Sequence, residues 1–173
     1  MAILEGVSQG ITFCTASGNG QHAFPGNLPE TISVGGVFVD ETSNLFASSY
    51  ASSFSSTWFP GRYVPDICGL CGERPDADYM VLPVQAESVL EKDQGWGAFS
   101  GTSSAAAQVA GVCALLKQAK PELTPESLKR NLEYTATDIT ATHTPYRTTA
   151  APGWDLATGF GLVNAKSALD LIL

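Results

Sequence analysis

The sequence predicts an α/β fold with a mostly parallel sheet, and three observations support this. Short apolar, β-branched segments alternate with helix-like segments along the chain. Residues 104–118 combine an apolar 3.6-residue period with Ala and Gly on the remaining faces, which is typical of a buried helix. Hydrophobic residues make up 44% of the 173 residues, which is enough to build a core and excludes a disordered chain.

The elements of the first part of the chain are short. Residues 2–9 are typical of the end of a helix, and Gly10 terminates it because glycine readily adopts the left-handed conformation. Residues 11–15 predict a buried strand, and residues 31–39 predict a second strand. The turn between them begins at residues 16–20, where Asn-Gly tolerates a positive φ.

The middle of the chain gives weaker signals. Residues 42–62 are rich in Ser and aromatic residues without a clear period, which predicts loops with short strands. Residues 72–98 contain two prolines and several acidic residues, and we expect an extended surface loop there.

Two helices are expected after the buried one. Thr124 and Pro125 fit the N-cap and the first helical position of the next helix. A last helix is expected from Ala165 to about Leu171, after Asn164. Since we find neither an internal repeat nor a linker, we expect residues 1–173 to form part of one domain without an internal boundary.

The charge balance limits the classes of partner. The chain has 17 Asp and Glu against 9 Lys and Arg, a net charge of −8, which argues against a nucleic-acid partner. No apolar run approaches the roughly 18 residues that span a membrane, so we expect no membrane partner. The first residues lack a charged region and a cleavage site, so no secretory signal is expected in them, and the sequence leaves the localisation unknown.

The four cysteines do not suggest a disulfide framework. Cys14 and Cys113 lie in apolar segments and are interpreted as small buried hydrophobic residues. Cys68 and Cys71 form a C-x-x-C pair, for which plain thiols are favoured over a local disulfide or a metal site. No second Cys or His pair stands at the spacing of a zinc site, so no metal ligands are assigned.

Two segments carry residues suited to chemistry. Ser103 stands at the start of the buried helix, where a hydroxyl becomes a nucleophile if a base removes its proton. Asn19 lies in a turn after a strand, where its amide could donate to an oxyanion. Taken separately, each local pattern favours a simpler alternative: an N-cap serine and a turn asparagine.

The surrounding residues resemble a known family. Residues 101–111 are similar to the nucleophile motif of the subtilisin-like serine proteases, the subtilases, which is Gly-Thr-Ser-x-Ala-x-Pro-x-Val-Ala-Gly. Residues 15–20 resemble the family's oxyanion segment, and residues 24–36 the stretch that follows it. Residues 153–165 resemble its closing element, so the motifs occur in the family's order over nearly the whole chain.

The resemblance implies roles for individual residues. Ser103 is the expected nucleophile of peptide-bond hydrolysis, and Asn19 the expected oxyanion donor together with the Ser103 backbone N–H. Ala16, Ser17 and Gly18 are expected to line the pocket for the side chain that precedes the scissile bond of a polypeptide substrate. The family often has a cis peptide bond at the position of Pro25.

The chain departs from the family pattern in several places. Ala107 replaces the motif's Pro, and Gln108 replaces its usual His. The loop between Asn19 and Phe24 is short, which leaves the far wall of the substrate pocket open to question. Calcium is common in the family, but apart from Asp76 and Asp78, which lack the rest of a ligand loop, no acidic cluster stands out, so no cofactor is expected.

The family's catalytic Asp and His precede the oxyanion segment in the chain order Asp, His, Ser. The sequence contains two histidines, and both His22 and His143 are interpreted as surface-loop residues. The resemblance therefore implies the C-terminal part of a subtilase catalytic domain, with N-terminal strands missing and the N-terminal half as a partner, in cis or as a second chain. Such a chain is expected to be inactive alone; the alternatives are a non-catalytic remnant that binds peptides or proteins, and a purely structural domain.

Overall fold

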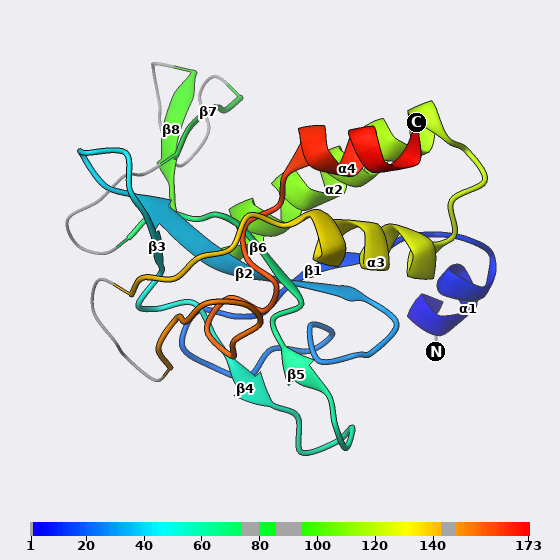
Figure 1. Cartoon of the computed structure of the whole chain (residues 1–173), viewed down its shortest axis with the longest axis horizontal. Coiled ribbons are helices and arrows are strands. Elements are labelled where there is room, and N and C mark those ends of the chain that lie inside the picture. Colours follow the sequence, from blue (N-terminus) through cyan, green and yellow to red (C-terminus); the bar gives the residue numbers. More distant parts are fainter. Residues whose placement is uncertain (1, 74–79, 86–94, 143–147) are drawn as a thin grey trace.

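The computed structural model describes residues 2–73, 80–85, 95–142 and 148–173 (Figure 1). Its centre is a four-stranded sheet around β2 (Ile32–Val39). Two strands, β1 (Cys14–Ala16) and β6 (Ile67–Leu70), pair with β2 in parallel, and β3 (Leu45–Ala47) pairs with it in antiparallel orientation. The prediction of a mostly parallel sheet is confirmed.

The register places β1 and β3 along one edge of β2 and β6 along the other. Val34 pairs with both β1 and β6, and Val37 pairs with both β3 and β6, so β6 must lie opposite the other two strands. Within the described residues, β1 pairs with no strand besides β2. The outer edge of β1 therefore offers unpaired backbone groups.

The strand predictions differ in how well they match. The strand expected at residues 31–39 is confirmed. The strand expected at 11–15 begins only at Cys14, and Ile11 is 52% exposed; β1 is half-buried because it lies at the sheet edge. Strand β6 was not predicted, because it is short, follows Pro65 and contains Gly69, which weakens a strand signal.

The helices agree closely with the expected ones. Thr124 caps its helix by accepting a 3.1 Å hydrogen bond from the Ser127 N–H, and Asn164 accepts a 3.0 Å bond from the Ser167 N–H. Gly10 has a φ of 85°, as a helix-terminating glycine should. No described helix is long and apolar enough to cross a membrane. The helices are α1 (Ala2–Ser8), α2 (Thr102–Ala119), α3 (Pro125–Thr135) and α4 (Ala165–Ile172).

The core consists of two clusters, because alternate strand residues point to opposite faces of the sheet. On one face, where Figure 1 shows α2, α3 and α4, strand side chains pack against these helices. On the other face they pack against residues between 139 and 162. The helical cluster includes Ile32, Val34, Ile67, Cys71, Val109, Leu116, Leu128, Leu132 and Ala168; the other includes Val37, Ala47, Cys68, Ile139, Ala150 and Ala157.

All four cysteines are free. Cys68 and Cys71 belong to opposite clusters, so the plain-thiol interpretation is confirmed and the local disulfide is wrong. Cys113 is buried as expected, whereas Cys14 is only half-buried because β1 is an edge strand.

Two hairpins extend from the sheet. The first joins β4 (Phe54–Ser55) to β5 (Tyr63–Val64). The second joins β7 (Met80–Pro83) to β8 (Trp96–Phe99) within the region expected to be a surface loop, and it projects from the body of the molecule (Figure 1). Its solvent exposure fits that expectation, while its strand pairing was not predicted.

Gly69 allows α2 to pack closely on the sheet. A Cβ atom at this position would lie 2.8 Å from the Ala105 carbonyl oxygen and 3.1 Å from the Ala105 Cα atom. We expect Gly69→Val to lower the free energy of unfolding by about 1–3 kcal/mol, because the helix backbone must move away. Urea unfolding of the chain measures this.

Gly111, which is exposed on α2, provides the matched control. Nothing lies within 4 Å of a Cβ atom added there, so Gly111→Ala should raise the free energy of unfolding by about 0.5–1 kcal/mol through helix propensity. Equal stability of the Gly69→Val variant and the wild type would contradict the packing described for α2.

Candidate active site

Ser103 lies in the first turn of α2 and is exposed. The N-cap of α2 is Gly101, not Ser103, so the interpretation of Ser103 as a capping residue is wrong. Because the first N–H groups of a helix have no intrahelical acceptor, the Ser103 N–H is free to bind another group. The Ser103 hydroxyl makes no hydrogen bond within the described residues. Both groups therefore lie at the positive end of the helix dipole.

The turn into α2 is fixed to the end of β6. The Gly101 N–H donates a 2.9 Å hydrogen bond to the Cys71 carbonyl oxygen, and the Tyr50 hydroxyl donates a 2.6 Å bond to the same oxygen. Burial and the neighbouring Cys71 raise the pKa of Tyr50 above its usual value, so the phenol stays protonated at neutral pH. These contacts fix the position of Gly101, the residue before Thr102.

Asn19 follows β1 on a loop that is tethered to residues 51–52. The Ser52 N–H donates a 2.8 Å hydrogen bond to the Gly18 carbonyl oxygen, and the Gly20 N–H donates a 3.0 Å bond to the Ser52 hydroxyl. Asn19 itself pairs with Ala51 in an isolated antiparallel bridge and is exposed. The loop is thus held by a second segment of the chain.

Thr102 joins the two segments. The Asn19 Oδ1 atom accepts hydrogen bonds from the Thr102 N–H and from the Thr102 hydroxyl, both at 3.0 Å. The Gly18 N–H donates to the same hydroxyl at 3.3 Å. Since Oδ1 is used as an acceptor by Thr102, the Nδ2 donor of Asn19 is left for another partner.

Gly101 permits this close approach. It has a φ of 120°, and a Cβ atom there would lie 3.3 Å from the Asn19 Nδ2 atom. The Asn19 Nδ2 group and the free Ser103 N–H are therefore two donors at one end of α2, beside an exposed hydroxyl. Such an arrangement can stabilise an oxyanion that forms when the hydroxyl attacks a carbonyl carbon.

The three residues expected to line a substrate pocket lie just before Asn19. Ala16 ends β1 and is half-buried, while Ser17 and Gly18 are buried. A Cβ atom at Gly18 would meet the Gln21 carbonyl oxygen and the Ser52 hydroxyl, because the short loop folds back over it. The pocket role of these three residues remains a prediction.

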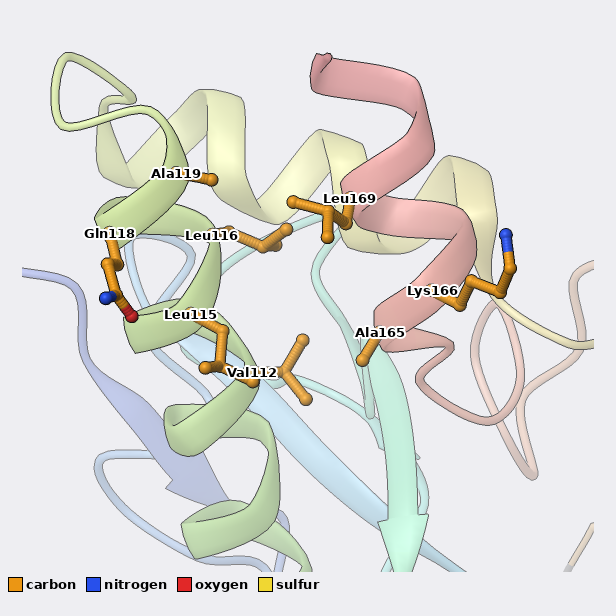
Figure 2. A pocket seen from close by; sticks show the side chains of 8 residues that line it. All are labelled: Val112, Leu115, Leu116, Gln118, Ala119, Ala165, Lys166 and Leu169. Carbon is orange, nitrogen blue, oxygen red and sulfur yellow. The ribbon is translucent and has the colours of Figure 1, made fainter.

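A separate cavity of about 560 Å³ lies between α2 and α4. Figure 2 shows Val112, Leu115 and Leu116 of α2 facing this cavity with Leu169 of α4. These residues belong to the C-terminal half of α2, whereas Ser103 lies at its N-terminal end. The cavity is therefore not part of the candidate active site.

The chain matches a known protein family over most of its length. The sequence model of the family described as "Subtilase family" matches residues 2–161 of the chain. The chain belongs to the subtilase family. The order of motifs noted in the sequence is therefore explained by common ancestry with these serine proteases.

Curated relatives of this subtilase chain include three named proteins. Fervidolysin from Fervidobacterium pennivorans is 28% identical over 170 residues, which are 95% of this chain and 22% of the relative. Alkaline elastase YaB from Bacillus sp. (strain YaB) is 27% identical over 184 residues, covering 95% of this chain and 44% of the relative. The subtilisin-like protease SBT2.3 from Arabidopsis thaliana is 42% identical over 80 residues, covering 41% of this chain and 10% of the relative. The chain thus spans less than half the length of these relatives.

Solved structures confirm the subtilase fold. Fervidolysin superimposes with a TM-score of 0.76 at 22% identity, covering 98% of this chain and 24% of that chain. A protease from Pseudoalteromonas arctica superimposes with a TM-score of 0.74 at 26% identity, covering 99% of this chain and 46% of that chain. The predicted subtilisin-like α/β architecture is therefore confirmed.

The departures from the subtilase motif have structural consequences. Gln108, at the usual His position, donates a 2.8 Å hydrogen bond from Nε2 to the Leu70 carbonyl oxygen and accepts a 3.2 Å bond from the Leu70 N–H. It also contacts Met80 of β7, so Gln108 ties α2 to two strands. The Phe24–Pro25 peptide bond is cis, as the family resemblance led us to expect.

Of the two histidines, only His22 lies within the described residues. His22 is exposed and stacks on Phe54 with ring centroids 4.1 Å apart, which confirms its interpretation as a surface-loop residue. His143, like Asp76 and Asp78, lies outside the described residues. Among the residues that the structure describes, no three His, Cys, Asp or Glu side chains gather as metal ligands, and calcium binding stays untested.

The residues that support the site carry no local sequence signal. Thr102 stands inside the nucleophile motif, yet its hydrogen bonds to Asn19 join positions 83 residues apart and have no local signal. Tyr50 and Ser52 lie in a Ser-rich segment without a helical or strand periodicity, and no sequence pattern there indicates a supporting role.

Proposed function

We propose that this subtilase chain supplies the nucleophile and the oxyanion-binding part of a serine endopeptidase. The observation that carries the proposal is the junction of Asn19 with the N-terminus of α2 through Thr102. This junction places an exposed amide donor at the end of α2 that carries the exposed Ser103.

The proposed reaction is acyl transfer. The Ser103 Oγ atom attacks the carbonyl carbon of a peptide bond while a histidine takes its proton. The Asn19 Nδ2 group and the Ser103 N–H hold the oxyanion of the tetrahedral intermediate. The histidine then gives the proton to the leaving amine, and a water molecule hydrolyses the acyl-enzyme so that the Ser103 hydroxyl is restored.

The substrate is a polypeptide in an extended conformation. The family binds its substrate as an added strand, and the side chain before the scissile bond is proposed to enter the pocket lined by Ala16, Ser17 and Gly18.

The histidine and its aspartate are proposed to come from an additional segment. In the family order both precede the oxyanion segment, and His22 is stacked on Phe54. We define the Asp/His-bearing segment as the part of a subtilase domain that carries these two residues, in cis or as a second chain. Without it the chain should be inactive, because in subtilisin itself loss of the histidine costs a factor of about 2 × 10⁶ in kcat.

Mixing the chain with the Asp/His-bearing segment tests the proposal. Hydrolysis of a fluorogenic peptide that needs both components supports an endopeptidase. Peptide binding without hydrolysis at any ratio of the components would overturn the proposal in favour of a non-catalytic, peptide-binding remnant. The two components together are called the assembled protein below.

Thr102→Val should lower kcat of the assembled protein by about 5–10-fold. The variant keeps the shape of the side chain but removes the hydroxyl that positions Asn19 Oδ1, and one hydrogen bond contributes about 1 kcal/mol. KM should change little, because the hydroxyl is buried away from substrate. Thr102→Ser, which keeps the hydroxyl, should restore most of the rate; an equal loss in both variants would contradict the positioning role.

A further inference from the structure

Cys14 and Cys113 form a pair of neighbouring thiols that the proposed reaction does not use. Their Sγ atoms lie 3.8 Å apart, and both thiols are free. Cys14 is half-buried in β1, and Cys113 is 5% exposed in α2. The two positions are 99 residues apart in the sequence, so the fold brings them together.

The distance between the sulfur atoms is close to bonding range. A disulfide bond requires about 2.05 Å, so the atoms must approach by about 1.8 Å. Rotation of the two side chains and a small shift of β1 can supply this movement. Strand β1 is suited to such a shift, because within the described residues it pairs with β2 alone.

The other two cysteines do not share this arrangement. Cys68 contacts Gly35 on one face of the sheet, and Cys71 contacts Gly36 on the other face. Both are fully buried, so neither can meet the other or an external oxidant without unfolding. Cys68 and Cys71 therefore serve as a control pair, in which we expect no disulfide bond.

We propose that Cys14 and Cys113 form an oxidisable dithiol site that closes into a disulfide between β1 and α2. A small disulfide such as oxidised glutathione is the oxidant. One thiolate of the pair attacks it, giving a mixed disulfide and releasing one glutathione thiol. The second thiol loses its proton and displaces the second glutathione thiol, so the two cysteines lose two electrons and two protons in all.

The local environment suits the first of these steps. The half-buried Cys14 gives the oxidant access to the pair. The product would join the strand that leads to Ala16–Asn19 to the helix that carries Ser103, and so fix the two parts of the oxyanion site to each other.

Thiol mapping of the chain in glutathione buffers tests this proposal. The chain is equilibrated over a range of reduced to oxidised glutathione, quenched in acid, and alkylated with N-ethylmaleimide after unfolding. In oxidising buffer we expect two alkylated residues, Cys68 and Cys71, and a linked peptide pair containing Cys14 and Cys113. Dithiothreitol should restore four alkylated cysteines.

Variants separate this site from non-specific oxidation. Cys71→Ala should keep the cross-link, whereas Cys14→Ser and Cys113→Ser should each abolish it. In Cys113→Ser a glutathione adduct should remain on the half-buried Cys14. Four alkylated cysteines in the wild type at every buffer ratio would overturn the proposal, and so would a cross-link that involves Cys68 or Cys71. Because the wild type alone gives a decisive result, a folding defect in a variant does not affect the test.

Discussion

Replacing Ser103 by alanine is expected to abolish peptide-bond hydrolysis by the assembled protein, with a fall in kcat of about 10⁶-fold. The value follows subtilisin, a member of the same family, in which removal of the nucleophile costs about 2 × 10⁶ in kcat. The loss is large because the exposed Ser103 hydroxyl is the proposed attacking group, and without it only oxyanion binding and substrate positioning remain. Initial-rate kinetics on a fluorogenic peptide measure the effect.

Ser104→Ala is the matched control. Ser104 is the next residue of α2 and is half-buried, and its side chain has no role in the proposed reaction. We expect its kcat within about twofold of the wild type, as for a substitution away from the site. A Ser103→Ala variant that retains more than a hundredth of the wild-type rate would show that another residue is the nucleophile.

Replacing Asn19 by alanine is expected to lower kcat by about 10²–10³-fold with little change in KM. The side chain is proposed to bind the oxyanion, which exists only in the transition state and the intermediate, so ground-state binding of substrate is largely unaffected. The kcat and KM of the assembled protein, measured separately, distinguish this from a loss of substrate binding.

Asn19→Asp separates the proposed chemical role of Asn19 from its structural one. The variant keeps an oxygen that can accept the two hydrogen bonds from Thr102, but it replaces the Nδ2 donor by a negatively charged oxygen. It should therefore fold normally and lose at least as much rate as Asn19→Ala. Asn44→Ala, at an exposed asparagine in another loop, serves as the control and should keep the wild-type rate. Full activity of Asn19→Asp would contradict the oxyanion role.

The helices and strands that could be predicted from the sequence are those with a strong local sequence pattern. The caps at Thr124 and Asn164 act within three residues, so the helix starts could be placed from the sequence alone. Strand β2 is apolar and long, which gives a strong pattern. Strand β6 also pairs with β2, yet its four residues include a glycine and give almost no pattern.

The sequence predicted which residues form the candidate site, but not how they are arranged in space. The motifs identified Ser103 and Asn19, because each segment resembles the family in its own few residues. Their connection through Thr102 depends on how α2 packs against the loop after β1, which no local pattern contains. The supports from Tyr50 and Ser52 come from a third segment and were invisible for the same reason.

The most direct test of the central claim is covalent labelling by a fluorophosphonate, which reacts with an activated serine. Intact mass is measured for the chain alone, for the assembled protein and for the assembled protein carrying Ser103→Ala. We predict one adduct, on Ser103 of the assembled protein, and none in the other two samples. An unlabelled assembled protein, or an adduct that persists in the Ser103→Ala variant, would contradict the assignment of Ser103 as the nucleophile. Labelling of the chain alone would contradict the need for the Asp/His-bearing segment and would point to His22 or His143 as the base.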